Sequence, residues 1–255
     1  MEIKPRVKLL FPPTNPIETI YCAASQCYSS EFICDIIGTD KSPTIEEMIT
    51  LILKVIKSGH TSILEHVKYT FAIDGVSRAN THQIVRHRIA SYSQQSQRYC
   101  DMSKDESFEY IIPESIRNNK KTLSLYINLM KVIDTTYGNL KEILSKDLKT
   151  SEQVNQDARY VLPNACSSKI VTTMNIRALF NFFELRCCNR AQWEIRYIAN
   201  EMLKLCKENC PSIFELTGPK CKQLGYCPEG KFTCGKFIEI MKDKIVRLKG
   251  STVDI

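Results

Sequence analysis

The sequence predicts a mixed α+β protein, with a single helix-rich domain around a largely antiparallel sheet. Long stretches with apolar residues three and four apart indicate helices, and short β-branched runs indicate only a few strands. These strands do not alternate regularly with helices, as a doubly wound parallel sheet would require. The chain also has no GxGxxG motif, so a Rossmann-type cofactor site has no sequence support.

The first sixty residues supply one strand and two helices. Residues 6–11 predict the strand, and residues 17–29 predict a short helix. A clearer helix follows Ser42, with Pro43 at its first position and apolar residues at helical spacing. Gly59 is expected to end it.

A second strand and a third helix come next. Residues 66–73 are strand-like, and Gly75 is expected to break that strand. Ser77 has the position of an N-cap for a helix that extends through residue 88. In that helix three side chains would share one face: Gln83, Arg86 and His87.

The second half of the chain is mostly helical. Ser151 is expected to cap a short helix that holds Arg159 and ends by Pro163. The remaining segments are a loop and strand at 101–113, a helix at 114–146, a β-rich run at 167–176, and amphipathic helices at 177–187 and 191–207.

Composition is that of a soluble globular protein, with 43% hydrophobic and 25% charged residues in 255. No apolar stretch approaches the roughly 18 to 20 residues that span a membrane, and no signal-peptide core is evident, which predicts a cytoplasmic protein without a membrane partner. The net charge of +7 favours anionic ligands. A nucleic-acid module would more often show lysine-rich arms, whereas the arginines here lie within apolar stretches, so no nucleic-acid partner is predicted.

Twelve cysteines in such a chain are expected to be reduced thiols rather than a disulfide framework. Four lie near the end of the chain, in a segment rich in glycine and proline: Cys210, Cys221, Cys227 and Cys234. They lack the CxxC pairs of a typical zinc site. Ordinary reduced cysteines are favoured over structural metal, and no metal ligand is predicted.

The most informative stretch runs from Arg86 to Tyr99, RHRIASYSQQSQRY. It places guanidinium groups and an imidazole beside hydroxyl and amide side chains, a mixture that suits a phosphorylated, hydrogen-bonding small molecule. Adjacent cations repel one another, so anions or carboxylates must offset them when the region folds. Taken by composition alone, such a basic run is more often a solvated face.

The pattern RHRxxSxxxxSxRY resembles the signature of the flavin-dependent thymidylate synthases. Three further blocks are similar to that family in the same order: SGHTSILEH at 58–66, DARYVLP at 157–163 and NIRALFNFFELRCCNRAQWEIR at 175–196. The resemblance covers roughly Pro43 to Pro211. It implies a domain over residues 1–211, with residues 212–255 as a cysteine-rich extension packed on that domain.

The family resemblance implies an enzyme that converts dUMP to dTMP. It implies FAD as cofactor, with 5,10-methylenetetrahydrofolate and NADPH as co-substrates, and a homotetramer with sites at subunit junctions. Hydride from the reduced flavin would attack C6 of the pyrimidine while the folate supplies carbon to C5. No protein nucleophile is then needed, in contrast to the thymidylate synthases that use a cysteine.

The resemblance also assigns residues to the flavin. The FAD-binding positions would be Ser62, Arg86, His87, Arg88, Gln94, Asn175, Ile176, Arg177 and Asn181. Guanidinium groups suit the pyrophosphate, and amides suit the ring or the adenine. Without the resemblance, helix capping or a surface amide would be the preferred interpretation of Asn175 and Asn181.

A second set of positions matches the dUMP site. These are Gln83, Ile84, Val85, Arg86, Gln94, Gln95, Ser96, Gln97, Arg98, Arg159 and Arg186. Arg159 and Arg186 lie in apolar surroundings, where an unpaired guanidinium is costly to bury, and a salt bridge is the alternative to ligand binding. Arg186 is the predicted catalytic residue, because a cation would stabilise negative charge on the activated pyrimidine.

Four positions need separate comment. Ser96 has no local base, so hydrogen bonding to the nucleotide is favoured over nucleophilic attack. The family often has Asn and Glu where Ser93 and Gln94 stand, and commonly His where Arg190 stands. Gln94 keeps the hydrogen bonding but removes a charge.

Two other functional classes stay open for this chain, a nucleic-acid-binding protein and a zinc-stabilised interaction protein.

Overall fold

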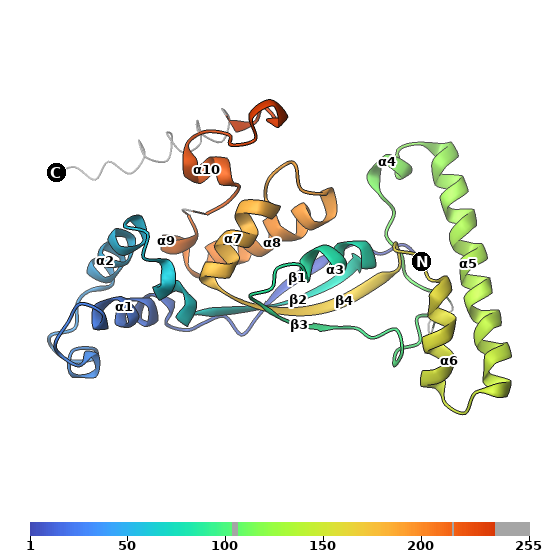
Figure 1. Ribbon diagram of the computed structural model, residues 1–255, viewed down its shortest axis with the longest axis horizontal. Coiled ribbons are helices and arrows are strands. Elements are labelled where there is room, and N and C mark those ends of the chain that lie inside the picture. Colours follow the sequence, from blue (N-terminus) through green and yellow to red (C-terminus); the bar gives the residue numbers. More distant parts are fainter. Residues whose placement is uncertain (104–106, 216, 238–255) are drawn as a thin grey trace. The chain divides into compact units, whose positions relative to one another are not determined.

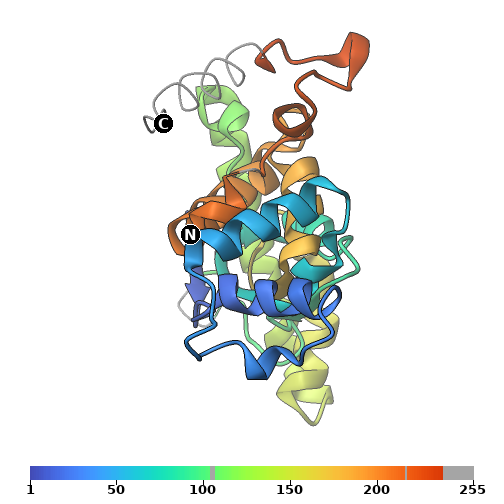
Figure 2. The same cartoon turned by 90° about the vertical axis from the view of Figure 1, so that its left-hand side faces the viewer.

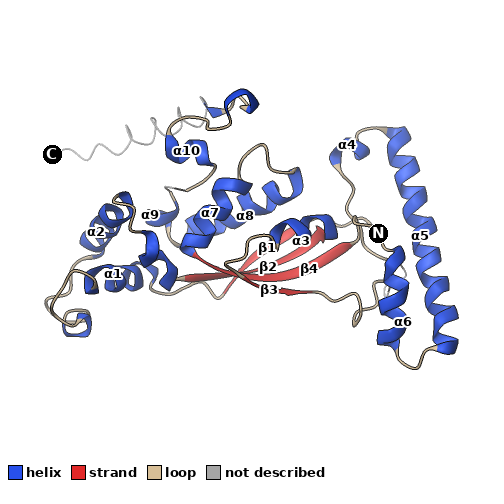
Figure 3. Cartoon of the chain, viewed as in Figure 1, coloured by secondary structure: helices blue, strands red, loops and turns tan. Residues whose placement is uncertain are grey.

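The computed structural model describes residues 1–103, 107–215 and 217–237. The chain divides into two compact units, which are taken in turn below. Unit 1 comprises Met1–Lys8 and Ala72–Thr172, and unit 2 comprises Leu9–Phe71 and Thr173–Ile255. Long helices and a small sheet confirm the predicted α+β class (Figure 3).

Four antiparallel strands form the sheet, in the order β1-β2-β4-β3 (Figure 1). Their bounds are Arg6–Leu10 for β1, Lys68–Ser77 for β2, Ser91–Gln94 for β3 and Ser167–Asn175 for β4. The strands at 6–11, 66–73 and 167–176 are therefore confirmed. In β2 the aromatic residues Tyr69 and Phe71 are buried and alternate with Lys68 and Thr70, as the two-residue period of a strand requires.

Gly75 does not break the second strand, contrary to prediction. It lies within β2 at φ 68°, and a Cβ at this position would come within 2.3 Å of the backbone oxygen of Lys4. Only glycine combines that positive φ with so close a neighbouring chain. The residue is a point of close backbone approach rather than a strand end.

Unit 1 contains four helices among its described residues, with bounds α3 Arg78–Ile84, α4 Glu114–Arg117, α5 Lys120–Asp147 and α6 Ser151–Ala158. The long α5 lies beside α6 (Figure 1). Phe108, Met130 and Cys166 form a buried cluster beneath α5. The N-cap of α6 is Thr150 rather than the predicted Ser151, since the Thr150 hydroxyl accepts the backbone N–H of Gln153. The helix ends at Ala158, so Arg159 lies just after it.

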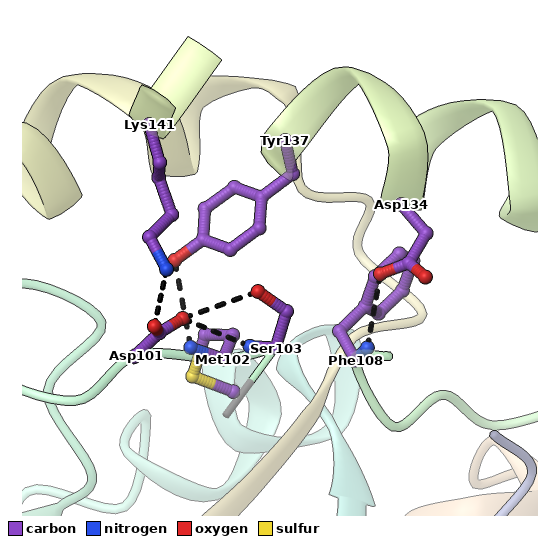
Figure 4. Close-up of polar contacts among 7 residues, drawn as sticks. All are labelled: Asp101, Met102, Ser103, Phe108, Asp134, Tyr137 and Lys141. Atoms are coloured by element: carbon purple, nitrogen blue, oxygen red, sulfur yellow. Dashed lines mark hydrogen bonds and ion pairs between the residues drawn. The ribbon is translucent and has the colours of Figure 1, made fainter. Parts of the chain in front are cut away.

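Polar contacts attach the loop at residues 101–103 to α5 (Figure 4). Lys141 forms an ion pair with Asp101, whose carboxylate also accepts the backbone N–H of Ser103 at 3.0 Å. The phenol oxygen of Tyr137 accepts the backbone N–H of Met102 at 3.4 Å. Burial raises the pKa of Asp101, but hydrogen bonds from Lys141 and Ser103 outweigh that effect and leave the pKa lowered.

Unit 2 carries the remaining described helices, with bounds α1 Pro16–Gln26, α2 Ile45–Lys57, α7 Ile176–Arg186, α8 Trp193–Asn209, α9 Pro211–Phe214 and α10 Lys220–Leu224. Figures 1 and 2 both show α1 beside α2. The core holds Tyr69 edge-on to Phe214 at 5.3 Å between ring centroids. The Tyr69 hydroxyl donates to the Asn209 amide oxygen at 2.7 Å, which satisfies the one polar atom of that buried ring.

The start of α2 differs from the prediction, whereas its end agrees with it. The helix begins at Ile45, because Thr44 and Glu47 form a capping box, so Pro43 lies outside it rather than at its first turn. Gly59 follows its end at φ 85°, as predicted. No helix within the described residues is long and apolar enough to cross a membrane.

Candidate functional site

The RHR run does not lie on a helix. Ser77 caps α3 as predicted, its hydroxyl accepting the backbone N–H of Asn80 at 3.0 Å, but the helix ends at Ile84. Residues 85–90 form a turn between α3 and β3, called the motif turn here. The predicted helical face of Gln83, Arg86 and His87 is therefore wrong.

Tyr92 fixes the shape of the motif turn. Its phenol oxygen lies 2.9 Å from the carbonyl of Ile84 and 2.7 Å from the carbonyl of His87, so one O–H serves two backbone acceptors. Burial raises the pKa of Tyr92 to about 12, which keeps the phenol protonated as a donor. The sequence interpretation missed this residue, because its partners are backbone atoms.

The two arginines of the motif turn lack a carboxylate partner among the described residues. Arg86 and Arg88 are exposed, and neither forms an ion pair with any residue that the structure describes. Arg159, half-buried just after α6, also forms none within the described part of the chain. These three guanidinium groups have donors to offer an anionic ligand.

Arg78 is a further cation in unit 1 that the sequence interpretation missed. It is half-buried at the start of α3, and burial first, then the charge of Arg159, lower its pKa, while Cys166 opposes the shift. Two guanidinium groups whose charges repel are stabilised by a shared anion. Nothing in the sequence distinguishes Arg78 from an ordinary first-turn residue, because Arg159 lies 81 positions further along the chain.

The polar residues after the motif turn form hydrogen bonds with other residues of unit 1. The amide of Gln94 donates to Thr81 at 2.9 Å and to Ser168 at 3.0 Å, and the backbone N–H of Gln95 donates to Lys169 at 2.8 Å. Gln97 is buried, with its amide nitrogen 3.7 Å from the sulfur of Cys166. These residues hold the segment in place.

Ser96 and Arg98 also have local partners. The Ser96 hydroxyl accepts the backbone N–H of Arg98 at 3.2 Å, in a tight turn. Arg98 forms an ion pair with Glu152, and its guanidinium lies 5.4 Å from the ring centroid of Tyr99. Arg98 thus differs from Arg86 and Arg88 in having a carboxylate beside it.

In unit 2, the residues predicted to face FAD gather at the start of α7. Asn175 caps this helix, its side-chain oxygen accepting the backbone N–H of Ala178 at 2.8 Å, so helix capping, one of the two interpretations of this residue, is what the structure shows. Ile176 is buried, with its N–H bonded to the Val67 carbonyl at 3.0 Å. Arg177 forms an ion pair with Glu65.

Ser62 and Asn181 are exposed. Ser62 lies in the 3-10 turn Thr61–His66, and Asn181 lies on the solvent side of α7. Both have side chains placed to meet a ligand from solvent.

Arg186 is the last residue of α7. It is half-buried, and burial lowers the pKa of its guanidinium. Its side chain lines a cavity of about 380 Å³ together with Arg190 and Lys220. Arg159 and Arg186, which were expected in apolar surroundings, are both half-buried, which leaves them reachable from solvent.

The four cysteines near the end of the chain do not lie together. Cys210 is buried near Cys206 and Tyr69, whereas Cys221, Cys227 and Cys234 line the cavity beside Arg186. Across the described residues, no three His, Cys, Asp or Glu side chains are arranged to hold a metal ion.

Comparison with known proteins gives a consistent result. The model of the family described as thymidylate synthase complementing protein matches residues 8–212. A flavin-dependent thymidylate synthase of Nitratidesulfovibrio vulgaris is 49% identical over 237 residues, 92% of this chain and 96% of that protein. Proteins with the same description from Clostridium tetani and Geobacter sulfurreducens are 46% and 42% identical, over 93% of this chain in each case and over 96% and 97% of those proteins.

Proposed function

The chain belongs to the flavin-dependent thymidylate synthase family, and from that membership we propose the details of its reaction. It is an enzyme that makes thymidylate with a flavin. The finer proposal is reductive methylation of dUMP to dTMP, with FAD as the flavin, 5,10-methylenetetrahydrofolate as carbon donor and NADPH as electron source. The observation that carries it is the set of uncompensated guanidinium groups of Arg86, Arg88 and Arg159.

The dUMP phosphate is assigned to Arg86 and Arg159. A phosphate monoester carries up to two negative charges and accepts paired N–H donors, which a guanidinium presents in a fixed fork. Arg78 adds positive charge next to Arg159. Arg98 is a weaker candidate than the resemblance implies, since Glu152 already neutralises it.

Amide and backbone groups complete the proposed nucleotide site. The remaining positions are Gln83, Ile84, Val85, Gln94, Gln95, Ser96 and Gln97. Among these, Gln94 is held by Thr81 and Ser168, so its amide is oriented before any ligand arrives. Preorganised polar groups lose little entropy on binding.

FAD is assigned to Arg86, His87 and Arg88 of the motif turn, and in unit 2 to Ser62, Asn181 and the segment Asn175–Arg177. The residues fit the cofactor, since Arg88 offers an uncompensated cation to a pyrophosphate and the Tyr92 hydroxyl holds the turn that presents it. When bound, the flavin supplies the hydride that this reduction requires. Asn175 would contribute through the backbone that it caps.

Arg186 is the proposed catalytic residue. Its half-buried guanidinium would stabilise negative charge that develops at N3 or O4 of the pyrimidine, and its partial burial strengthens that effect. We propose that no protein nucleophile takes part. Ser96 accepts a backbone hydrogen bond from Arg98, with no base among its hydrogen-bond partners in the described structure.

A homotetramer and a cytoplasmic location are further parts of the proposal. Leu125, Leu129 and Val132 form an exposed apolar stripe along α5, which a second subunit would cover. All twelve cysteines are free thiols, which suits a reducing compartment. The proposal includes no nucleic-acid or membrane partner.

A reconstitution assay tests the proposed function. Purified chain is mixed with dUMP, 5,10-methylenetetrahydrofolate, FAD and NADPH, and dTMP is measured by mass spectrometry while each component is omitted in turn. Product should depend on all four. A protein that stays colourless after FAD is added, and forms no dTMP, would contradict the proposal.

Two variants test the mechanism in the same assay. Arg186→Ala should abolish dTMP formation with an unchanged circular dichroism spectrum, because the cation that stabilises the pyrimidine is gone. Ser96→Cys should retain part of the activity. Near-normal turnover of the arginine variant would remove the proposed role of Arg186.

A further inference from the structure

Five cysteines from two stretches of the chain line one cavity of unit 2. Cys187 and Cys188 follow the end of α7, Cys221 lies on α10, and Cys227 and Cys234 lie in the turns beyond it; Arg186 lines the same cavity. Cys221 and Cys234 therefore border the same cavity from different turns of the chain.

The thiols differ in access to solvent. Cys234 is exposed, whereas Cys221 is buried. The Asn189 amide donates to the Cys234 sulfur at 3.5 Å and, with the Lys236 backbone N–H, lowers the pKa of that thiol. Burial raises the pKa of Cys221. An exposed thiol with a lowered pKa that shares a cavity with a second, buried thiol is the arrangement in which thiols oxidise in two steps.

The segment that carries these cysteines has little core. Between residues 219 and 237, called the cysteine segment here, Cys221 is the one buried side chain. Its contacts with the loop after α7 lie at the surface. Arg190 forms an ion pair with Glu229 at 2.6 Å, and the Arg190 guanidinium lies 4.7 Å from the Phe232 ring centroid. Segments with few buried contacts open at low free-energy cost, so the sulfur atoms of Cys234 and Cys221 can move close enough to form a bond.

We propose that Cys234 and Cys221 form a thiol oxidation site that reacts with hydroperoxides to give an intramolecular disulfide. The Cys234 thiolate attacks a peroxide oxygen, the O–O bond breaks, and the leaving hydroxide takes a proton to become water. Cys221 then attacks the sulfenic sulfur, the S–S bond forms, and a second water leaves with the Cys221 proton. Two electrons pass from the sulfurs to hydrogen peroxide.

The disulfide would attach the end of the cysteine segment to α10, beside Arg186. If the proposed role of Arg186 holds, oxidation also lowers the rate of dTMP formation by restricting that cavity. The oxidation site itself does not depend on that role. A thiol readout therefore separates failure of this proposal from failure of the proposed function.

Peptide mapping tests the site directly. The full-length reduced protein is exposed to hydrogen peroxide, remaining thiols are blocked with N-ethylmaleimide, and the protein is digested with trypsin without reduction. Cleavage after Lys220, Lys222, Lys231 and Lys236 puts Cys221, Cys227 and Cys234 on separate peptides. The expected product joins the peptides of Cys221 and Cys234, in a protein that remains one covalent chain.

Matched variants sharpen the test. The free thiol of Cys234 should react with hydrogen peroxide at least about fivefold faster than that of Cys27, an exposed cysteine outside the cavity, because hydrogen bonds to the Cys234 sulfur lower its pKa. Cys27→Ser should leave the linked peptide unchanged. In Cys221→Ser, Cys234 should accumulate as the sulfenic acid, trapped with dimedone.

Three results would overturn the proposal. The first is a Cys234 thiol that oxidises no faster than Cys27. The second is a link that joins Cys234 to another chain. The third is one tightly bound zinc per chain that shields these thiols until a chelator is added, since cysteines of this cavity would then be metal ligands.

Discussion

The motif turn and the loop after α7 both present exposed arginines, yet they differ in how those arginines are compensated. Arg86 and Arg88 in the motif turn form no ion pair with the described residues, while Tyr92 holds the backbone that presents them. In the loop after α7, Arg190 is already paired with Glu229 of the cysteine segment. Exposure and charge alone therefore do not mark a binding site, and the proposed phosphate site rests on unpaired charge presented by a hydrogen-bonded backbone.

The largest effect should come from removing a motif-turn cation. Arg86→Ala is expected to weaken dUMP binding by about 10-fold to 100-fold, because charge-assisted hydrogen bonds to phosphate contribute about 1.5 to 3 kcal/mol. Isothermal titration calorimetry on the FAD-loaded protein measures this. Arg190→Ala is the control, and its effect should stay within about twofold, since that cation is already neutralised. Equal losses would erase the distinction between the two regions.

The next effect concerns the backbone that presents those cations. Tyr92→Phe removes the donor for the Ile84 and His87 carbonyls and should cost about 1 to 2 kcal/mol of unfolding free energy, measured by urea denaturation. FAD affinity should fall with it. Tyr99→Phe is the control, because that side chain is exposed. A Tyr92 variant with unchanged stability and FAD affinity would show that the turn holds its shape without the phenol.

Altering Glu152 makes a paired arginine resemble an unpaired one. Glu152→Gln releases Arg98, and if an uncompensated cation is what binds phosphate, dUMP should bind about twofold to fivefold more tightly at low salt. Raising the salt concentration should reduce the gain. Titration of both proteins at two ionic strengths measures it, and weaker binding by the variant would mean that Glu152 itself assists the nucleotide.

The smallest effect compares the ion pairs that hold the two regions. Asp101→Asn, just after the RHRIASYSQQSQRY stretch, should lower the free energy of unfolding by about 0.5 to 1 kcal/mol at neutral pH. Glu229→Gln at the cysteine segment should lower it by less, because the Arg190–Glu229 pair is more exposed than the Lys141–Asp101 pair. The pKa of Asp101 is lower in the folded state, so its contribution is lost as the pH falls through that pKa, below the ordinary value of about 3.9. Denaturation at a series of pH values from 7 downward measures both, and a cost for Asp101→Asn that does not decline as the pH falls would contradict the ion-pair explanation.

Local signals in the sequence predicted most of the fold. Ser77 preceded a helix that it does cap, and the apolar spacing of residues 176–186 and 193–209 placed α7 and α8 within a residue or two. The end of α3 was missed because no glycine or proline marks it. Tyr92, eight residues further along, supplies the hydrogen bond that replaces the next helical turn.

The site was predicted in composition but not in detail. Motif resemblance named Arg86, Arg98 and Arg177 alike, because a sequence does not show which guanidinium meets a carboxylate. Arg78 escaped notice for the same reason, since its neighbour Arg159 is brought near only by folding. Long-range pairing was the information that the sequence lacked.

A crystal structure of the protein with FAD and dUMP bound tests the central claim most directly. It should show the dUMP phosphate within hydrogen-bonding distance of Arg86 and Arg159, and the FAD pyrophosphate against Arg88. Phosphate groups bound instead at the paired arginines Arg98 or Arg177, with the motif turn facing solvent, would contradict it.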